Sequence, residues 1–201
     1  MVIMPTSPKR SAPTALYRNS QLYICPPRPR DGKAFLAAAH ASRKLHGAWV
    51  RAPQSSKAFR EYVARFGARA QRDPQSATDA GILVRSAGDD SLIGVFNFSE
   101  IVRGAFQSAY LGYYAFAPYA GSGRMADGLA LALRYAFRTL NLHRVEVNVQ
   151  PRNVRSHALV QKAGFVREGF SRRYLRIGGR WRDHVRYALL VEDWRARRNL
   201  R

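Results

Sequence analysis

The sequence predicts an α+β fold, with a single domain in which helices flank a mixed central sheet in three layers. Three observations predict it: two amphipathic helical segments come first, several segments with strand character follow, and a glycine-rich turn then connects a strand directly to a helix. A chain of 201 residues, 46% of them hydrophobic, is long enough for one domain with a buried core. We expect a flexible tail over residues 1–20, the folded domain over residues 21–194 and a basic tail over residues 195–201.

The first part of the chain predicts one short strand and two helices. Gln21–Ile24 has strand character and is stopped by a proline-rich run, since proline cannot donate to a sheet ladder. The helices are indicated by apolar residues at three- and four-residue spacing behind a polar capping residue: residues 32–45 behind Asp31, and a second helix from Ser55 or Ser56 to Asp73. Each helix therefore has one apolar face.

The rest of the chain is rich in strand signals, which are β-branched and aromatic residues bounded by turn residues. The composition of residues 86–91 is typical of a hairpin turn, and Gly178 and Gly179 predict a second hairpin. The expected strands are residues 81–85, 92–99, 109–117, 143–150, 170–177 and 184–191, with a short helix at residues 154–163 between Asn153 as its cap and Gly164 as its stop.

A glycine-rich turn, Gly121-Ser122-Gly123, opens directly into the helix with the clearest apolar face. The residues of that face are Leu129, Leu133, Ala136 and Leu140. A strand, a glycine turn and a helix in this order direct backbone N–H groups and a helix N-terminus at a phosphate. The same residues also fit a tight connection that binds nothing, so the turn alone leaves both interpretations open.

Charge and composition narrow the class of protein. The net charge of +21 indicates an anionic partner such as RNA or a ribosome, although basic residues spread over nearly the whole length also fit a general compositional bias. Cys25 is the only cysteine and the 5 histidines show no ligand spacing, so we expect neither a disulfide nor a metal site. No apolar run approaches the roughly 20 residues that span a membrane, and no signal peptide is visible, so we expect a cytoplasmic protein with no membrane partner.

Four stretches of the sequence together are similar to one enzyme superfamily: residues 93–113, 121–129, 151–170 and 179–190. They resemble the GNAT superfamily of acyl-CoA-dependent N-acetyltransferases and, within it, the RimJ/RimL group, which acetylates N-terminal amines of ribosomal proteins. The segments FSEIVRG and GRWRDH resemble the alanine-specific RimJ branch in particular. The resemblance implies one GNAT domain, acetyl-CoA as co-substrate and direct transfer of the acetyl group in a ternary complex.

The resemblance assigns the glycine turn to the pyrophosphate of acetyl-CoA. Backbone N–H groups of the turn are expected to donate to it, and the arginine that follows can add a charged contact. The family usually has Gln or Arg where this chain has Ala120, and Gly or Ala where it has Met125. The residues expected to bind the cofactor are Tyr113, Phe116, Gly121, Ser122, Gly123, Arg124, Met125, Ala126 and Asn153.

Transfer of an acetyl group from a thioester to an amine needs a base for the ammonium and a hydrogen-bond donor for the departing thiolate. The resemblance places the base at Glu168, with Glu146 as the second candidate. Ser156 matches the family's hydroxyl near the thiolate, and Tyr174 is a weaker candidate. Glu168 and Ser156 also have a purely structural interpretation: Glu168 can form a surface ion pair with a neighbouring arginine, and Ser156 can hydrogen-bond the helix backbone.

The expected function is transfer of an acetyl group to the N-terminal amine of a small-subunit ribosomal protein whose first residue is expected to be alanine. Two alternatives remain open: a GNAT that acetylates a small amine such as a polyamine or an aminoglycoside, and a ribosome- or RNA-associated factor with little catalysis. Cationic small substrates favour an acidic pocket, and the chain has only 13 acidic residues. The basic surface fits association with a ribosome.

Overall fold

The structure is a computed structural model that describes residues 15–47, 49–67 and 69–199, and these residues form an eight-stranded sheet flanked by helices. The expected tails lie outside the described residues over 1–14 and 200–201. The strands, in chain order, are β1 (Tyr17–Arg18), β2 (Leu22–Cys25), β3 (Ala80–Ser86), β4 (Leu92–Val102), β5 (Ser108–Ala115), β6 (Arg144–Val149), β7 (Val166–Ile177) and β8 (Arg180–Leu190). The helices are α1 (Gly32–Ala41), α2 (Arg43–His46), α3 (Ser56–Phe66), α4 (Arg69–Arg72), α5 (Arg124–Arg138), α6 (Val154–Ala163) and α7 (Val191–Asn199), with 3₁₀ turns η1 (Pro29–Asp31) and η2 (Ala117–Tyr119).

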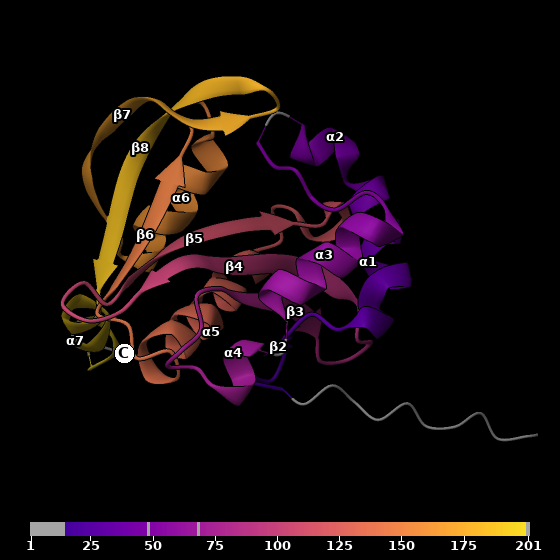
Figure 1. Cartoon of the computed structure of the whole chain (residues 1–201), viewed down its shortest axis with the longest axis horizontal. Coiled ribbons are helices and arrows are strands. Elements are labelled where there is room, and N and C mark those ends of the chain that lie inside the picture. The colour runs from indigo at the N-terminus through magenta and orange to yellow at the C-terminus, as the bar shows by residue number, and fades with distance from the viewer. Residues whose placement is uncertain (1–14, 48, 68, 200–201) are drawn as a thin grey trace, which may run out of the picture.

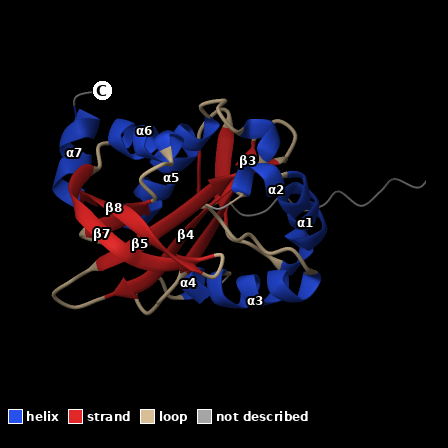
Figure 2. Ribbon diagram, turned by 90° about the horizontal axis from the view of Figure 1, so that it is seen from above, coloured by secondary structure: helices blue, strands red, loops and turns tan. Residues whose placement is uncertain are grey.

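Helices cover both faces of the sheet. Seen from above, α5 and α6 lie on one side of the strands and α3 and α4 on the other (Figure 2). The α5 side carries the larger hydrophobic core, while α1 and α3 enclose a second core against β3, β4 and β5. Aromatic side chains dominate this second core: Phe35, Phe59, Tyr62, Tyr114 and Phe116. The predicted three-layer α+β domain is confirmed.

One parallel pair, β5 with β6, makes the sheet mixed; the other neighbouring strands of the described sheet are antiparallel. The parallel pairing joins residues 108–110 to residues 144–146 and then stops, although β5 continues to Ala115 and β6 to Val149. The two strands therefore separate toward their carboxyl ends, which is visible in Figure 1. We call this gap the splay. Ligands of open α/β sheets bind at such carboxyl-terminal gaps.

Helix α5 makes the crossover between the two parallel strands, as parallel pairing requires. Its predicted apolar face is confirmed, because Leu129, Leu133, Ala136 and Leu140 are all buried. Gly128 lets the helix approach the sheet closely: a Cβ there would lie 3.1 Å from Val84 and 3.2 Å from Phe96. The close packing fixes the start of α5 relative to β3 and β4.

The predicted helix over residues 32–45 is broken at Ser42. The Ser42 hydroxyl donates to the carbonyl of Ala38 at 2.7 Å and accepts from the N–H of Ala117 at 2.8 Å, which ties the end of α1 to the end of β5. Asp31 does not cap α1 with its side chain, so that expectation was wrong. Its carboxylate instead accepts from the N–H of Arg28 and from the guanidinium of Arg85.

The second predicted helix ends at Phe66 and not at Asp73. Ser55 is its cap and accepts from the N–H of Ala58 at 3.2 Å, as expected. At Gly67 a Cβ would collide with the carbonyl of Val63, so the chain turns there without a side chain. The short helix α4 follows.

The C-terminal hairpin is longer than predicted, with β7 beginning at Val166 and β8 at Arg180. Residues 195–199, expected as part of a tail, continue α7, whose Trp194 packs on Phe137 with ring centroids 5.2 Å apart. At the other end, β1 lies within the range expected to be a tail. None of the helices that the structure describes is both long and apolar enough to cross a membrane.

Candidate active site

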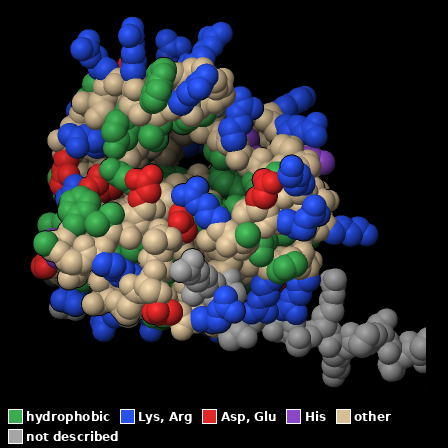
Figure 3. All heavy atoms as spheres, in the orientation of Figure 1, with side chains coloured by type: hydrophobic (Ala, Val, Ile, Leu, Met, Phe, Trp, Pro, Cys, Tyr) green, Lys and Arg blue, Asp and Glu red, His purple; other side chains and the backbone are tan. Residues whose placement is uncertain are grey.

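The candidate site lies at the splay, between the β7–β8 hairpin and the helices on the α3 side of the sheet. The space-filling view shows the molecule hollowed there, with hydrophobic side chains in the wall and both basic and acidic side chains around the rim (Figure 3). The loop after α2 reaches across the opening, because a Cβ at Gly178 would lie 2.5 Å from the guanidinium of Arg51. The opening therefore has walls from segments far apart in the sequence.

The glycine turn stands at the start of α5 with the backbone that the sequence predicts. Gly121 and Gly123 both have φ of +81°, and a Cβ at either would meet nothing within 4 Å. Gly123 is the N-cap of α5 and offers no side chain to the first-turn N–H groups. An exposed, uncapped helix start behind a left-handed glycine is an anion-binding arrangement, so the turn fits a pyrophosphate.

Not every N–H group of the turn is available for an anion. The N–H of Ser122 donates to the carbonyl of Tyr119 at 3.3 Å, and that of Ala126 donates to the carbonyl of Gly123 at 2.9 Å. In the described part of the chain this leaves the N–H groups of Gly121, Gly123, Arg124 and Met125 without a backbone acceptor, and the last three lie at the start of α5. These three are the donors that would hold a phosphate.

The side chains of Arg124 and Met125 point to different partners. The Arg124 guanidinium lies 5.2 Å from the ring centroid of Tyr119. Met125 packs on β4 at Gly94, where a Cβ would collide with the methionine sulfur. The absence of a side chain at Gly94 therefore leaves the space that the Met125 side chain occupies.

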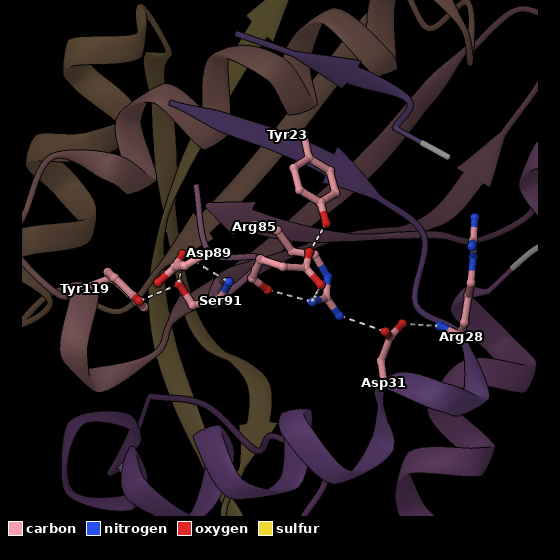
Figure 4. A network of polar contacts seen from close by, with 8 residues as sticks. Tyr23, Arg28, Asp31, Arg85, Asp89, Ser91 and Tyr119 are labelled. Carbon is pink, nitrogen blue, oxygen red and sulfur yellow. Dashed lines mark hydrogen bonds and ion pairs between the residues drawn. The ribbon is translucent and has the colours of Figure 1, made fainter. Parts of the chain in front are cut away.

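Tyr119 is the attachment point of the turn to the sheet. Its hydroxyl donates to Ser91 Oγ at 2.6 Å, and Ser91 Oγ donates to Asp89 at 2.7 Å, in the turn between β3 and β4 (Figure 4). Beside them, Arg85 donates to the carbonyl of Asp90 at 2.8 Å. This network fixes the position of the glycine turn without using the N–H groups of the turn.

Tyr113 and Ser156 meet across the splay. The Tyr113 hydroxyl hydrogen-bonds Ser156 Oγ and lies 3.4 Å from the Ser156 carbonyl. Asn153 caps α6 by accepting from the N–H of Ser156 at 3.2 Å, as predicted, and so fixes the first turn in which Ser156 lies. Burial raises the pKa of Tyr113 to about 12, so this hydroxyl keeps its proton at physiological pH.

Phe116 does not face the splay with its side chain. It is fully buried in the α1–α3 core, 5.5 Å from Phe35 between ring centroids, and its N–H donates to the carbonyl of Ile93. The expected contact between Phe116 and a cofactor is therefore unsupported by its position. Tyr113 is the residue of this strand that the structure places at the site.

Glu168 and Glu146 both accept hydrogen bonds from Arg144. The Arg144 guanidinium donates to both carboxylate oxygens of Glu168, and its Nε donates to Glu146 at 2.8 Å. The hydrogen bonds from Arg144 lower the pKa of Glu168, whereas a general base works best with a pKa near the working pH. Strand β8 also separates β7, which carries Glu168, from β6 at the splay. The structure thus brings Ser156 and Tyr113 together but does not bring Glu168 to them.

The structure also places two other residues considered from the sequence, Tyr174 and Cys25. The Tyr174 hydroxyl donates to the Tyr110 hydroxyl at 3.3 Å, on the face of the sheet opposite α6. Cys25 is fully buried, and burial raises the pKa of its thiol to about 11, so it is not a nucleophile.

Sequence reasoning missed the polar groups beneath α3. Tyr62 donates to Asn97 Oδ1 at 2.9 Å, and Tyr114 lines the same cavity. The alternation of β5 was the available signal, since Tyr113 and Tyr114 are neighbours and must point to opposite faces. Arg144 was missed as the partner of Glu168 because the two residues lie on different strands, β6 and β7, which only the fold brings together.

Comparison with known proteins agrees with this geometry. The family model of the acetyltransferase (GNAT) domain matches residues 21–166. A [ribosomal protein uS5]-alanine N-acetyltransferase of Escherichia coli K12 is 45% identical over 106 residues, which cover 53% of this chain and 55% of that protein. The matched segment thus spans about half the length of that relative.

Solved structures extend the likeness over most of the chain. Mycobacterium smegmatis RimJ in complex with CoA-disulfide has a TM-score of 0.76 and 26% identity, covering 85% of this chain and 82% of that one. Spermidine N-acetyltransferase from Vibrio cholerae, in complex with CoA and spermine, has a TM-score of 0.70 and 24% identity, covering 88% and 99%, and shows the shared fold alone. The chain belongs to the GNAT acetyltransferase domain family.

Proposed function

We propose that this protein transfers the acetyl group of acetyl-CoA to the N-terminal amine, with alanine as first residue, of a small-subunit ribosomal protein. One observation carries the proposal: an uncapped glycine turn and a pair of hydroxyl groups lie at the open splay of one sheet. The alanine acceptor is supported by the similarity to the Escherichia coli enzyme. A ribosomal substrate would place the reaction in the cytoplasm.

The proposed reaction forms one C–N bond and breaks one C–S bond. The neutral amine attacks the thioester carbonyl carbon, the thiolate of CoA leaves, and the nitrogen loses its remaining extra proton to water in the opening. Tyr113, hydrogen-bonded to Ser156, donates to the departing thiolate, and the N–H groups of Gly123, Arg124 and Met125 hold the pyrophosphate. Written from the neutral amine, the protons balance: the nitrogen releases one to water, the thiolate takes one up from Tyr113, and Tyr113 regains one from that water.

The test of the proposal is incubation with labelled acetyl-CoA and short peptides that begin with Ala, Ser or Met, beside a panel of small amines. We expect label on the α-amine of the alanine peptide first. Label on spermidine or an aminoglycoside in preference to every peptide would contradict the acceptor, and tight acetyl-CoA binding without any transfer would contradict the activity.

Tyr113→Phe is expected to lower kcat about ten- to a hundredfold, because the thiolate loses its donor. In the wild type, kcat/KM should rise through the amine pKa of about 8 and show no fall up to pH 10, since the raised pKa of Tyr113 keeps the donor protonated there. Stopped-assay kinetics across this pH range check both. Ser156→Ala should lower kcat less, and an unchanged kcat in Tyr113→Phe would remove the hydroxyl from the reaction.

Glu168→Gln is expected to lower kcat by less than tenfold and to leave the pH profile between 6 and 9 unchanged. The carboxylate is ionised throughout this range because Arg144 lowers its pKa, so it takes up no proton there. Initial rates at saturating acetyl-CoA measure the effect. A loss of several hundredfold would instead show that Glu168 leaves Arg144 during turnover and acts as the base that the resemblance implies.

A second candidate function, binding of RNA beside the ribosomal substrate, is favoured by the β7–β8 hairpin. Trp181 is 60% exposed there, and cations project from this part of the molecule (Figure 3); the exposed arginines are Arg172, Arg173, Arg176 and Arg180. Changing these four to Gln should reduce the slope of log Kd against log salt for single-stranded RNA by about three, at roughly 0.7 per cation. The matched control neutralises Lys33, Lys44, Lys57 and Arg60, which are also exposed, and an equal reduction there would show that the charge acts without a defined surface.

A further inference from the structure

Tyr119 stands between two turns of the chain: residues 87–91, which join β3 to β4, and the glycine turn at the start of α5 (Figure 4). We call residues 87–91 the β3–β4 turn. Three groups of Tyr119 make separate contacts: the hydroxyl with Ser91, the ring with Arg124 and the carbonyl with Ser122. Nothing in the transfer chemistry described above uses the Tyr119 side chain. One residue therefore joins the β3–β4 turn to both the backbone and the charged side chain of the glycine turn.

The hydroxyl of Tyr119 ends a hydrogen-bond chain that begins at a carboxylate. It donates to Ser91 Oγ at 2.6 Å, and Ser91 Oγ donates to Asp89 Oδ1 at 2.7 Å. Side-chain hydrogen bonds from Ser86 and Ser91 lower the pKa of Asp89 to about 2, so the carboxylate is ionised at physiological pH. A hydrogen bond to an ionised acceptor is stronger than one between neutral groups. The chain therefore holds the Tyr119 side chain in one orientation.

The carbonyl of Tyr119 orders the glycine turn. It accepts from the hydroxyl of Ser122 at 2.7 Å and from the N–H of Ser122 at 3.3 Å. Gly121 and Gly123, on either side of Ser122, are exposed, and a Cβ at either would meet nothing within 4 Å. No neighbouring side chain packs on these two glycines, so the position of the turn depends on the position of Tyr119.

The ring of Tyr119 holds the guanidinium of Arg124 at the start of α5. The distance of 5.2 Å from the guanidinium carbon to the ring centroid is that of a cation–π interaction. Arg124 is the one cation within residues 119–126, and none of the ion pairs among the described residues includes it. Its charge is therefore available to an anion at the N-terminus of the helix.

We propose that the β3–β4 turn sets the affinity for the pyrophosphate of acetyl-CoA through Tyr119, a positioning residue that itself touches no cofactor. The hydroxyl and carbonyl of Tyr119 fix the N–H groups of the glycine turn, and the ring keeps the Arg124 guanidinium within reach of the phosphate. The inference rests on the proposed function, which assigns the pyrophosphate to the glycine turn. It adds Ser91 and Asp89, which lie outside that turn, to the residues that determine cofactor affinity.

Two variants of Tyr119 separate the hydroxyl from the ring. Tyr119→Phe removes only the hydrogen bond to Ser91 and should raise the Kd of CoA about threefold, and Ser91→Ala should do the same. Tyr119→Leu also removes the ring from Arg124 and should raise the Kd about tenfold. In an Arg124→Gln background the ring has no guanidinium to hold, so Tyr119→Leu should there cost no more than Tyr119→Phe. Isothermal titration of CoA, without any acceptor, measures each Kd.

Tyr17 provides a matched control on the same helix. Its hydroxyl hydrogen-bonds Thr139 Oγ1 at 2.9 Å, and its ring centroid lies 4.7 Å from the guanidinium of Arg134, so it makes the same two kinds of contact as Tyr119. Arg134 lies roughly 15 Å along α5 from the glycine turn. Tyr17→Phe and Tyr17→Leu should leave the Kd of CoA unchanged. Thermal melting followed by circular dichroism shows that each variant is folded.

Three ligands locate the effect on the cofactor. CoA has the pyrophosphate and a 3′-phosphate, dephospho-CoA has only the pyrophosphate, and pantetheine has no phosphate. Tyr119→Leu should weaken CoA and dephospho-CoA by the same factor and change pantetheine, measured as a competitor of CoA, by less than about twofold. A loss confined to CoA would place the effect at the 3′-phosphate, and an equal loss for pantetheine would mean a general distortion of the site. Either result would overturn the inference.

The titrations also distinguish the inference from the proposed function. Unchanged CoA affinity in Tyr119→Leu, or an equal loss in Tyr17→Leu, would overturn the inference and leave the proposed function in place. Absence of CoA binding to the wild type would overturn both. Because the titrations contain no acceptor, transfer to spermidine in preference to every peptide would contradict the proposed acceptor and leave the inference standing.

Discussion

Replacing Asp31 by alanine is expected to lower the free energy of unfolding by about 3 kcal/mol, because it removes the buried carboxylate that pairs with Arg85 and leaves only the exposed Asp90 beside that buried charge. Arg85 Nη2 donates to Asp31 Oδ1 at 2.7 Å, and both side chains are less than a tenth exposed (Figure 4). The pair joins the start of α1 to β3, so its loss also loosens α1 from the sheet. Urea unfolding followed by circular dichroism measures the change.

The control for this prediction is Asp79→Ala. Asp79 Oδ1 lies 2.8 Å from Arg65 Nη2, and the Arg65 side chain is 55% exposed. An exposed ion pair contributes about 0–1 kcal/mol to the free energy of unfolding. A double variant, Asp31→Leu with Arg85→Met, should recover much of the stability that Asp31→Ala loses, since it leaves no unpaired charge. Equal losses for Asp31→Ala and Asp79→Ala would show that the buried pair is no more important than the surface one.

Gly123→Val is expected to weaken acetyl-CoA binding at least a hundredfold. The φ of +81° is unfavourable for a β-branched residue, and its side chain would enter open space in front of the N–H groups proposed to hold the pyrophosphate. Isothermal titration of acetyl-CoA measures the affinity, with circular dichroism to confirm that the variant is folded.

Gly104→Val separates backbone strain from blocked binding. Gly104 has φ of +67° and nothing within 4 Å of a Cβ, but it lies in the loop between β4 and β5. This variant should lose a similar amount of stability and still bind acetyl-CoA as the wild type does. Tight binding by Gly123→Val would mean that the turn is only a connection between β5 and α5.

Local sequence signals were sufficient wherever an element depends on its own residues. The four-residue spacing of α5, the caps at Ser55 and Asn153 and the alternation of β6 each predicted the structure, because these features arise within one turn or one strand. The same holds for the glycine turn, whose left-handed backbone glycine permits.

Long-range contacts decided the features that the sequence did not predict. The break at Ser42 depends on Ala117, which is 75 residues away in the chain, and the cap expected of Asp31 was lost to Arg85, 54 residues away. Glu168 has the expected ion pair, but its partner Arg144 comes from another strand and not from the neighbouring arginines. Residue spacing alone contains no information about such partners.

The alternation of β5 has a consequence for how this site can change. One strand carries the proposed thiolate donor, Tyr113, and the core residue Tyr114, whose ring packs on His46 and Phe116, so their separation is fixed by a single peptide unit. The pairs Phe96–Tyr113 and Val95–Tyr114 hold that register against β4. A slip by one residue would exchange the two tyrosines between faces, and would remove both the hydroxyl that meets Ser156 and an aromatic ring of the second core. The proposed donor and the second core therefore depend on the same register, and β5 must keep its length for both.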